Sequence, residues 1–161
     1  MIKKKSIYIE TTIPCFYHEI RMEPEMVARK NWTRQWWDTE RYNFNLYTSE
    51  AVIQELNSGE YPIKNEALQL IDEIDLLEID EDIQNIVDIY LSNHVMPNNR
   101  LGDALHLALA SYYKCEFLLT WNCVHIANAN KYRHIKIVNE KIGIYNPTIV
   151  TPIELSQDIE S

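Results

Sequence analysis

The sequence has few glycines, few cysteines and no long apolar run. Only three of its 161 residues are glycine, which argues against an all-β fold built on many tight turns. Its three cysteines, Cys15, Cys115 and Cys123, are odd in number and lack zinc-finger spacing. Reduced thiols in a cytoplasmic protein are the simplest interpretation of that pattern. No segment approaches the roughly 20 apolar residues of a membrane helix, so we expect no membrane association.

Basic charge is also scarce. Fifteen lysines and arginines face 24 acids, giving a formal net charge of −9. Such a chain does not coat itself non-specifically with nucleic acid, which excludes a histone-like function. The net charge remains compatible with an enzyme whose acids bind a metal and whose basic residues line a groove. The start, "MIKKK", precedes only a short apolar run that Glu10 breaks, and this is not the pattern of a signal peptide.

The elements that are present alternate between strands and helices. Hydrophobic content of 46% and the length fit one globular domain, placed at 1–150 with a polar tail at 151–161. Strands are predicted at 6–10, 44–48, 76–79, 115–120 and 134–139. Helices are predicted at 12–19 (or a turn), 24–42, 50–56 after a capping Ser49, 62–75, 81–94 and 101–114. This order predicts an α/β three-layer sandwich whose central, mostly parallel sheet of about five strands is flanked by helices. The proline-punctuated end, 145–161, is expected to pack loosely.

Polar side chains fall where predicted strands end or helices begin. Glu10 ends the first strand, Glu55 lies in the helix after the second, and Asn122 follows "LLT" of the fourth. Asp103 lies near the start of the strongly apolar helix "GDALHLALA". In parallel α/β sheets ligands bind outside the carboxyl ends of the strands, so these four side chains are expected to converge.

Each acid also has a simpler interpretation. Asp103 can complement the helix dipole, an effect of about 0.3–1 kcal/mol, and Glu55 alone is typical of an exposed helix surface. A buried carboxylate otherwise requires a partner or a cation. Clustered carboxylates repel each other, and a hard cation removes that penalty. Oxygen ligands select Mg²⁺ or Mn²⁺, for which Glu10, Glu55 and Asp103 are the candidate ligands.

Two threonines and two histidines adjoin these positions. Thr11 and Thr120 are candidates to donate to phosphate, although a hydroxyl at a strand end more often closes a turn. His106, one helical turn after Asp103, more often is a core histidine satisfied by a carbonyl than a catalytic group. His125 is equally ambiguous, and its polar loop favours a place near the site slightly more.

Aromatic and basic residues crowd a further segment. They are Arg29, Lys30, Trp32, Arg34, Trp36, Trp37 and Arg41. This mixture suits stacking on unpaired bases and contact with phosphates. For Trp32 and Trp36, four residues apart, a stripe in the core or in a dimer interface is the favoured interpretation. Three tryptophans in six residues exceed one stripe, so at least one is expected in a groove with a partner.

The motifs "IYIETT", "SEAVIQEL", "GDALHLALA" and "LLTWN" resemble the PIN domain family, in particular its VapC-type ribonuclease toxins. The resemblance covers about 6–150 and implies a compact α/β sandwich, an acidic Mg²⁺ or Mn²⁺ site and cleavage of single-stranded RNA. The catalytic positions it implies are Glu10, Glu55, Asp103 and Asn122. It also implies a cognate antitoxin and a homodimer, with helices near the tryptophan segment at both interfaces.

Two positions depart from the family pattern. Glu10 stands where an aspartate is usual, and Asn122 stands in place of a fourth acid. One alternative function is therefore a degenerate PIN domain that binds RNA or a protein without cleaving. Another is a small-molecule metal hydrolase, which the absence of a histidine-rich metal pattern disfavours.

Overall fold

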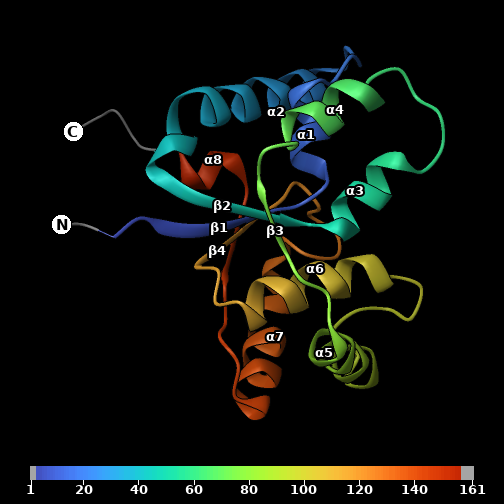
Figure 1. The fold of residues 1–161 in the computed structure, drawn as a ribbon, viewed down its shortest axis with the longest axis vertical. Coiled ribbons are helices and arrows are strands. Elements are labelled where there is room, and N and C mark those ends of the chain that lie inside the picture. Colours follow the sequence, from blue (N-terminus) through green and yellow to red (C-terminus); the bar gives the residue numbers. More distant parts are fainter. Residues whose placement is uncertain (1–2, 157–161) are drawn as a thin grey trace.

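The computed structural model describes residues 3–156, which fold around one five-stranded, all-parallel sheet (Figure 1). The strands are β1 (Lys5–Ile9), β2 (Phe44–Ser49), β3 (Asp75–Leu77), β4 (Phe117–Leu119) and β5 (Thr148–Val150). The α-helices are α1 (Thr12–Tyr17), α2 (Pro24–Gln35), α3 (Glu50–Asn57), α4 (Lys64–Leu70), α5 (Glu81–Ser92), α6 (Leu101–Tyr112), α7 (Ala129–Ile142) and α8 (Pro152–Leu155). A π-helical turn, η1 (Trp36–Glu40), and a 3₁₀ turn, η2 (Arg41–Asn43), join α2 to β2. The predicted α/β class with five strands is confirmed.

The sheet order is β3-β2-β1-β4-β5, which places β1 at the centre. Ile7 of β1 lies opposite Leu46 of β2 on one side and Phe117 of β4 on the other. Ile7, Tyr8 and Ile9 are fully buried, as expected for a strand covered on both faces. The chain runs from β1 outward to β3 on one side and then crosses to β4 and β5 on the other.

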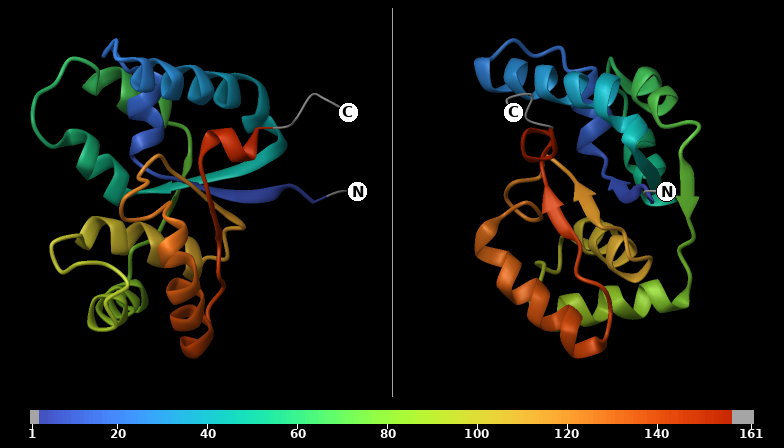
Figure 2. Two further views of the ribbon diagram at one scale, coloured as in Figure 1. Left: turned by 180° about the vertical axis from the view of Figure 1, so that it is seen from behind. Right: turned by 90° about the vertical axis from the view of Figure 1, so that its left-hand side faces the viewer.

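Helices cover both faces of this sheet. Figures 1 and 2 show α1, α2, α4 and α8 on one face and α5, α6 and α7 on the other. The apolar centre of α6, including Leu107, Ala108 and Leu109, is fully buried against the sheet. At the right of Figure 1, α3 and the start of α6 lie beside the carboxyl ends of the strands. No helix within 3–156 is long and apolar enough to cross a membrane.

The predicted strand at 134–139 is wrong, because these residues belong to α7. The letters "HIKIVN" alternate like a strand, which would place Ile135 and Ile137 on one face. In the helix Ile135 and Val138 are buried together, while Ile137 is 50% exposed. The side chain of Asn128 caps the start of α7 by accepting a hydrogen bond from the Asn130 N–H at 3.0 Å.

The last strand is formed by residues that were expected to pack loosely. Thr148–Val150 pair with β4, and Ile149 and Val150 are buried. Directly beyond the predicted domain boundary at 150, α8 lies beside α2 (Figure 2). The loose-packing expectation is therefore wrong for 148–155, and 157–161 lie outside the described residues. Pro147 and Pro152 flank β5, where a proline removes no ladder hydrogen bond.

The tryptophan segment is not one continuous α-helix. After Gln35 the chain widens into η1, where the Arg41 N–H donates to the Trp36 carbonyl five residues back. Trp36 and Trp37 are both buried, and Trp32 is partly buried against the core. The core interpretation of Trp36 is confirmed, and Trp37 joins it because the wide turn brings two successive side chains inward.

Candidate functional site

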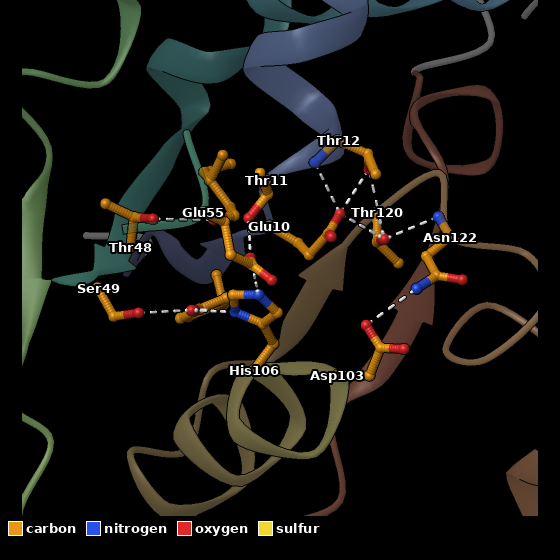
Figure 3. A network of polar contacts seen from close by, with 12 residues as sticks. Glu10, Thr11, Thr12, Thr48, Ser49, Glu55, Asp103, His106, Thr120 and Asn122 are labelled. Atoms are coloured by element: carbon orange, nitrogen blue, oxygen red, sulfur yellow. Dashed lines mark hydrogen bonds and ion pairs between the residues drawn. The ribbon is translucent and has the colours of Figure 1, made fainter. Parts of the chain in front are cut away.

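The predicted polar residues meet at the carboxyl ends of β1 and β4 (Figure 3). Glu10 follows β1 and Thr120 follows β4, and the Glu10 N–H donates to the Leu119 carbonyl at 3.2 Å. The strand order reverses between these two strands, since β2 and β3 lie on one side and β5 lies on the other. In open α/β sheets such a reversal leaves a crevice at the strand ends in which ligands bind.

Glu10 is held rigidly and is only 4% exposed. Its Oε1 accepts hydrogen bonds from the Thr12 N–H at 3.0 Å, the Thr12 hydroxyl at 2.5 Å and the Thr120 hydroxyl at 2.7 Å. Burial raises the pKa of Glu10 above its ordinary value, although the charge of His106 and these hydrogen bonds act in the opposite direction. Within 3–156 no hydrogen bond reaches Oε2, so this oxygen is free to accept a ligand.

Asp103 has one oxygen in use and one without a partner. The Asn122 side-chain amide donates to Oδ1 at 3.1 Å, while Oδ2 is buried and accepts no hydrogen bond from the described chain. Asp103 is 8% exposed, and neither of its oxygens accepts from the first N–H groups of α6. Dipole complementation alone therefore leaves the unpaired oxygen unexplained. A buried carboxylate oxygen without a donor calls for a cation or a water.

Asn122 connects the two acids. Its backbone N–H donates to the Thr120 hydroxyl at 2.9 Å, and that hydroxyl donates to Glu10. Its side-chain oxygen accepts from the His125 N–H at 3.1 Å, which fixes the amide toward Asp103. Glu10 and Asp103 are thus ends of one hydrogen-bonded chain, although 93 residues separate them in sequence.

Glu55 forms a second chain with His106. The carboxylate Oε1 lies 2.6 Å from His106 Nε2 and also accepts a hydrogen bond from the Thr11 hydroxyl. His106 is fully buried, and its Nδ1 lies 2.7 Å from the Tyr8 hydroxyl, which is 2.8 Å from the Ser49 hydroxyl. The expectation of a histidine satisfied by a carbonyl is therefore wrong. Ser49 does not cap α3 with its side chain either, because its hydroxyl bonds to Tyr8.

Opposing effects set the pKa values of this pair. Burial raises the pKa of Glu55, but the hydrogen bond and the charge of His106 outweigh burial and hold that pKa below its ordinary value. Burial lowers the pKa of His106, but the hydrogen bond and charge of Glu55, together with the charges of Glu10 and Asp103, raise it above its ordinary value. All three predicted acids therefore act on one buried imidazole.

Gly102 leaves room for the Glu55 carboxylate. A Cβ atom at position 102 would lie 2.7 Å from Glu55 Oε2, closer than any ordinary contact. This glycine, with Thr12, Tyr8 and Ser49, belongs to the site although the sequence analysis did not assign it there. A glycine in the first turn of a helix, next to a candidate ligand, is a signal that was available in "LGDAL".

The oxygen donors of these acids fit a hard cation. No three His, Cys, Asp or Glu side chains among residues 3–156 are arranged around one point in the way a protein-held metal requires. Glu55 Oε1 is engaged by His106 and Thr11, but Glu55 Oε2, Glu10 Oε2 and Asp103 Oδ2 accept no hydrogen bond from the described chain. Mg²⁺ retains several waters and binds through one or two carboxylates, which these acids can supply.

The remaining sequence candidates have structural partners. Thr11 and Thr120 donate to Glu55 and Glu10, so their hydroxyl protons are already engaged by acids. His125 is partly buried beside Asn122 and contacts it through its backbone N–H.

A hollow away from the acids lies beside the tryptophan segment. It has a volume of about 630 Å³ and is lined by residues of η1, η2, α4 and the start of β3, including Trp37, Arg41, Tyr42 and Glu66. Beside the acids, a hollow of about 280 Å³ borders Glu55 and Gly102.

Comparison with known proteins leaves the family open. A scan against models of protein families finds none that matches the chain, and a search of the curated proteins finds no relative. The resemblance to PIN domains therefore remains a hypothesis that depends on the quoted motifs and on the placement of the side chains described above.

Proposed function

We propose that the protein is a metal-dependent endoribonuclease of the PIN type that cleaves single-stranded RNA, and that it is the toxin of a toxin–antitoxin pair. The support is the agreement between the resemblance and the geometry. The four positions it implies, Glu10, Glu55, Asp103 and Asn122, belong to two hydrogen-bonded chains at the sheet edge where α/β folds bind ligands.

The single observation that carries the proposal is the unpaired oxygen of Asp103. Glu10 and Asp103 present free oxygens, and Thr12, Thr120 and Asn122 already hold the other oxygen of each carboxylate in place. Oxygen donors of this kind prefer Mg²⁺ or Mn²⁺. Such an ion, when bound, neutralises charge on the phosphate and lowers the pKa of a water.

The other residues would position the reactants. Glu55 is the most accessible acid of the site, with a side chain 40% exposed, and His106 and Thr11 fix its Oε1. Its lowered pKa keeps it ionised at neutral pH, so it can orient an attacking water by accepting its hydrogen bond. Asn122 holds Asp103 at a fixed angle and prevents it from turning toward the helix end.

Cleavage assays test this proposal directly. The purified protein is incubated with single-stranded RNA in Mn²⁺, Mg²⁺ or EDTA, beside a Glu10→Gln variant. Cleavage should require the ion and fall about 100-fold or more in the variant, because even outer partners of metal ligands contribute 10- to 100-fold. Equal residual cleavage by both proteins would identify a contaminating nuclease and refute the proposal.

Gly102→Ala should separate the geometry of Glu55 from its charge. The new methyl group displaces Glu55 Oε2, so cleavage should fall about tenfold, the lower end of the range for a misplaced group at such a site. Stability should change little, because alanine gains up to about 1 kcal/mol of helix propensity while the Glu55–His106 contact weakens. Unchanged cleavage in Mn²⁺ would show that the placement of Glu55 is irrelevant to activity.

A degenerate PIN domain that binds without cleaving is the second candidate. Specific observations favour it: Glu10 and Asn122 depart from the family pattern, and Glu55 pairs with His106 rather than facing the other acids. If this function is correct, the protein binds RNA or a protein partner, and no RNA fragments appear on addition of Mn²⁺ or Mg²⁺.

The proposed toxin function also predicts partners. An antitoxin would be encoded by a small neighbouring reading frame, and both proteins would reside in the cytoplasm. A homodimer is proposed from the resemblance, and light scattering of the purified chain measures it. A monomer with no neighbouring small gene would remove the toxin assignment while leaving the ribonuclease activity to be tested.

A further inference from the structure

A net-acidic protein with three acids at one edge must still attract a polyanion. Glu10, Glu55 and Asp103 repel the phosphates of RNA, and cations bound by the acids neutralise only part of that field. Basic side chains placed around the acids are therefore needed to hold the strand.

Two arginines that lie over the Phe16 ring already have carboxylate partners. Arg29 of α2 lies over the Trp121 ring with its guanidinium carbon 5.2 Å from the ring centroid, and it pairs with Glu25 at 2.8 Å. Arg21 pairs with Glu19 at 2.6 Å. A ligand phosphate would therefore compete with a carboxylate for each of these arginines.

Lys131 differs from both. It is partly buried near the start of α7, and its ammonium contacts the Val95 carbonyl at 3.4 Å and the Met96 sulfur at 3.6 Å. No ion pair within 4.0 Å in the described chain includes it. An ammonium group has three donors, and two long contacts to neutral atoms leave it poorly satisfied. Partly desolvated charges normally have a counter-ion.

The position of Lys131 relates it to the acids. Val95 and Met96 are buried in the loop that leads into α6, whose first turn carries Asp103. Burial lowers the pKa of Lys131, and the charge of Asp103 acts against that shift. Arg29 belongs to α2 on one face of the sheet, and Lys131 belongs to α7 on the opposite face (Figure 1). The two basic residues therefore lie on opposite sides of the sheet.

We propose that Lys131 binds a backbone phosphate of the RNA strand, forming a phosphate subsite on the α7 side of the acids. This inference rests on the proposed function, since it names how the same site holds its substrate.

The binding of a short fluorescein-labelled single-stranded RNA tests the subsite. Anisotropy is measured in Ca²⁺ over a series of salt concentrations, and gel electrophoresis confirms that the RNA stays intact. Lys131→Gln should weaken binding about tenfold, as expected for one lost charge-assisted hydrogen bond. The slope of log K against log salt should fall by about 0.7, the value for one phosphate contact on a single strand.

Two variants serve as controls. Lys131→Arg keeps the charge and should retain the salt slope. Lys136→Gln removes the same charge from the exposed side of the same helix, where Lys136 pairs with Glu140 at 3.9 Å, and should bind like the wild type. Thermal melting of each variant confirms that it is folded.

The outcomes separate this inference from the proposed function. If Lys131→Gln binds and cleaves RNA like Lys136→Gln, Lys131 is only a counter-charge for Asp103, and the subsite is refuted while the ribonuclease stands. If the wild type neither binds nor cleaves RNA, the proposed function fails and the subsite with it. A weaker affinity and a shallower slope in Lys131→Gln alone support the subsite, whether or not cleavage occurs.

Discussion

Asp103→Asn should lower metal-dependent RNA cleavage by about 100-fold or more, since even the outer partners of metal ligands contribute 10- to 100-fold. The same change should raise the thermal stability measured in EDTA. Asparagine keeps an oxygen that can accept the hydrogen bond from Asn122. It removes a charge from an oxygen that is buried without a partner, and this gain should outweigh the lost attraction of Asp103 to His106 and Lys131. A gain of about 1 kcal/mol corresponds to about 2–4 °C in a protein of this length.

Melting by circular dichroism and cleavage in Mn²⁺ give the two readouts. Asp88→Asn on α5 is the matched control, because Asp88 is exposed and distant from the strand ends. It should change neither quantity. A variant that loses stability together with activity would show that Asp103 is a structural residue, as its helix-dipole interpretation requires. Opposite changes in activity and stability are the signature of a functional site that is strained for its task.

The fold was predictable wherever the sequence pattern had one solution. A short apolar run such as "IYI" in β1 fits a strand buried on both faces, and "ALHLALA" fits a buried helix. The pattern failed at α7, where Ile135 and Ile137 alternate although only one of them is buried. It failed again at β5, because a strand of three residues is too short to show any period.

The acids were predictable because strand ends can be read from local sequence. Glu10 and Asn122 follow strands, and parallel strands bring their ends to one edge. The partners of His106 could not be predicted from the sequence. Tyr8 lies 98 residues away, and the direction of its hydroxyl depends on the packing of β1 against α6. Ser49 was misread for a related reason. A serine before a helix resembles a cap, but here the buried Tyr8 hydroxyl takes its side chain.

His106→Gln should destabilise the protein by about 2–3 kcal/mol near pH 6, since it breaks a buried hydrogen-bonded pair whose acid is partly screened by solvent. In the wild type both ring nitrogens are engaged, one by Glu55 at 2.6 Å and one by Tyr8 at 2.7 Å. Glutamine is long enough to reach one partner but cannot carry the charge. Urea unfolding in EDTA measures the loss.

The difference between wild type and variant should depend on pH in a defined direction. The pKa of His106 is raised in the folded state, so the folded protein holds its proton more tightly than the unfolded chain does. The stabilisation is complete below the ordinary histidine pKa of about 6.5 and is lost as the pH rises through the higher folded value. The pKa of Glu55 is lowered, so its contribution is lost as the pH falls through that lower value. The difference should therefore be largest between these limits.

Glu10 adds a further slope, which the comparison removes only in part because the charge of His106 lowers the pKa of Glu10. Its pKa is raised chiefly by burial, so its ionisation destabilises both proteins as the pH rises above the ordinary glutamate value of about 4.3. His125→Gln is the control for losing a histidine, because the described chain gives that ring no hydrogen bond. A difference that stays constant from acid to alkaline pH would mean that His106 is neutral throughout. Glu55 would then accept a hydrogen bond from a neutral His106, and no positive charge would lower the pKa of Glu55. The proposed role of Glu55 as an ionised acid would have to be abandoned.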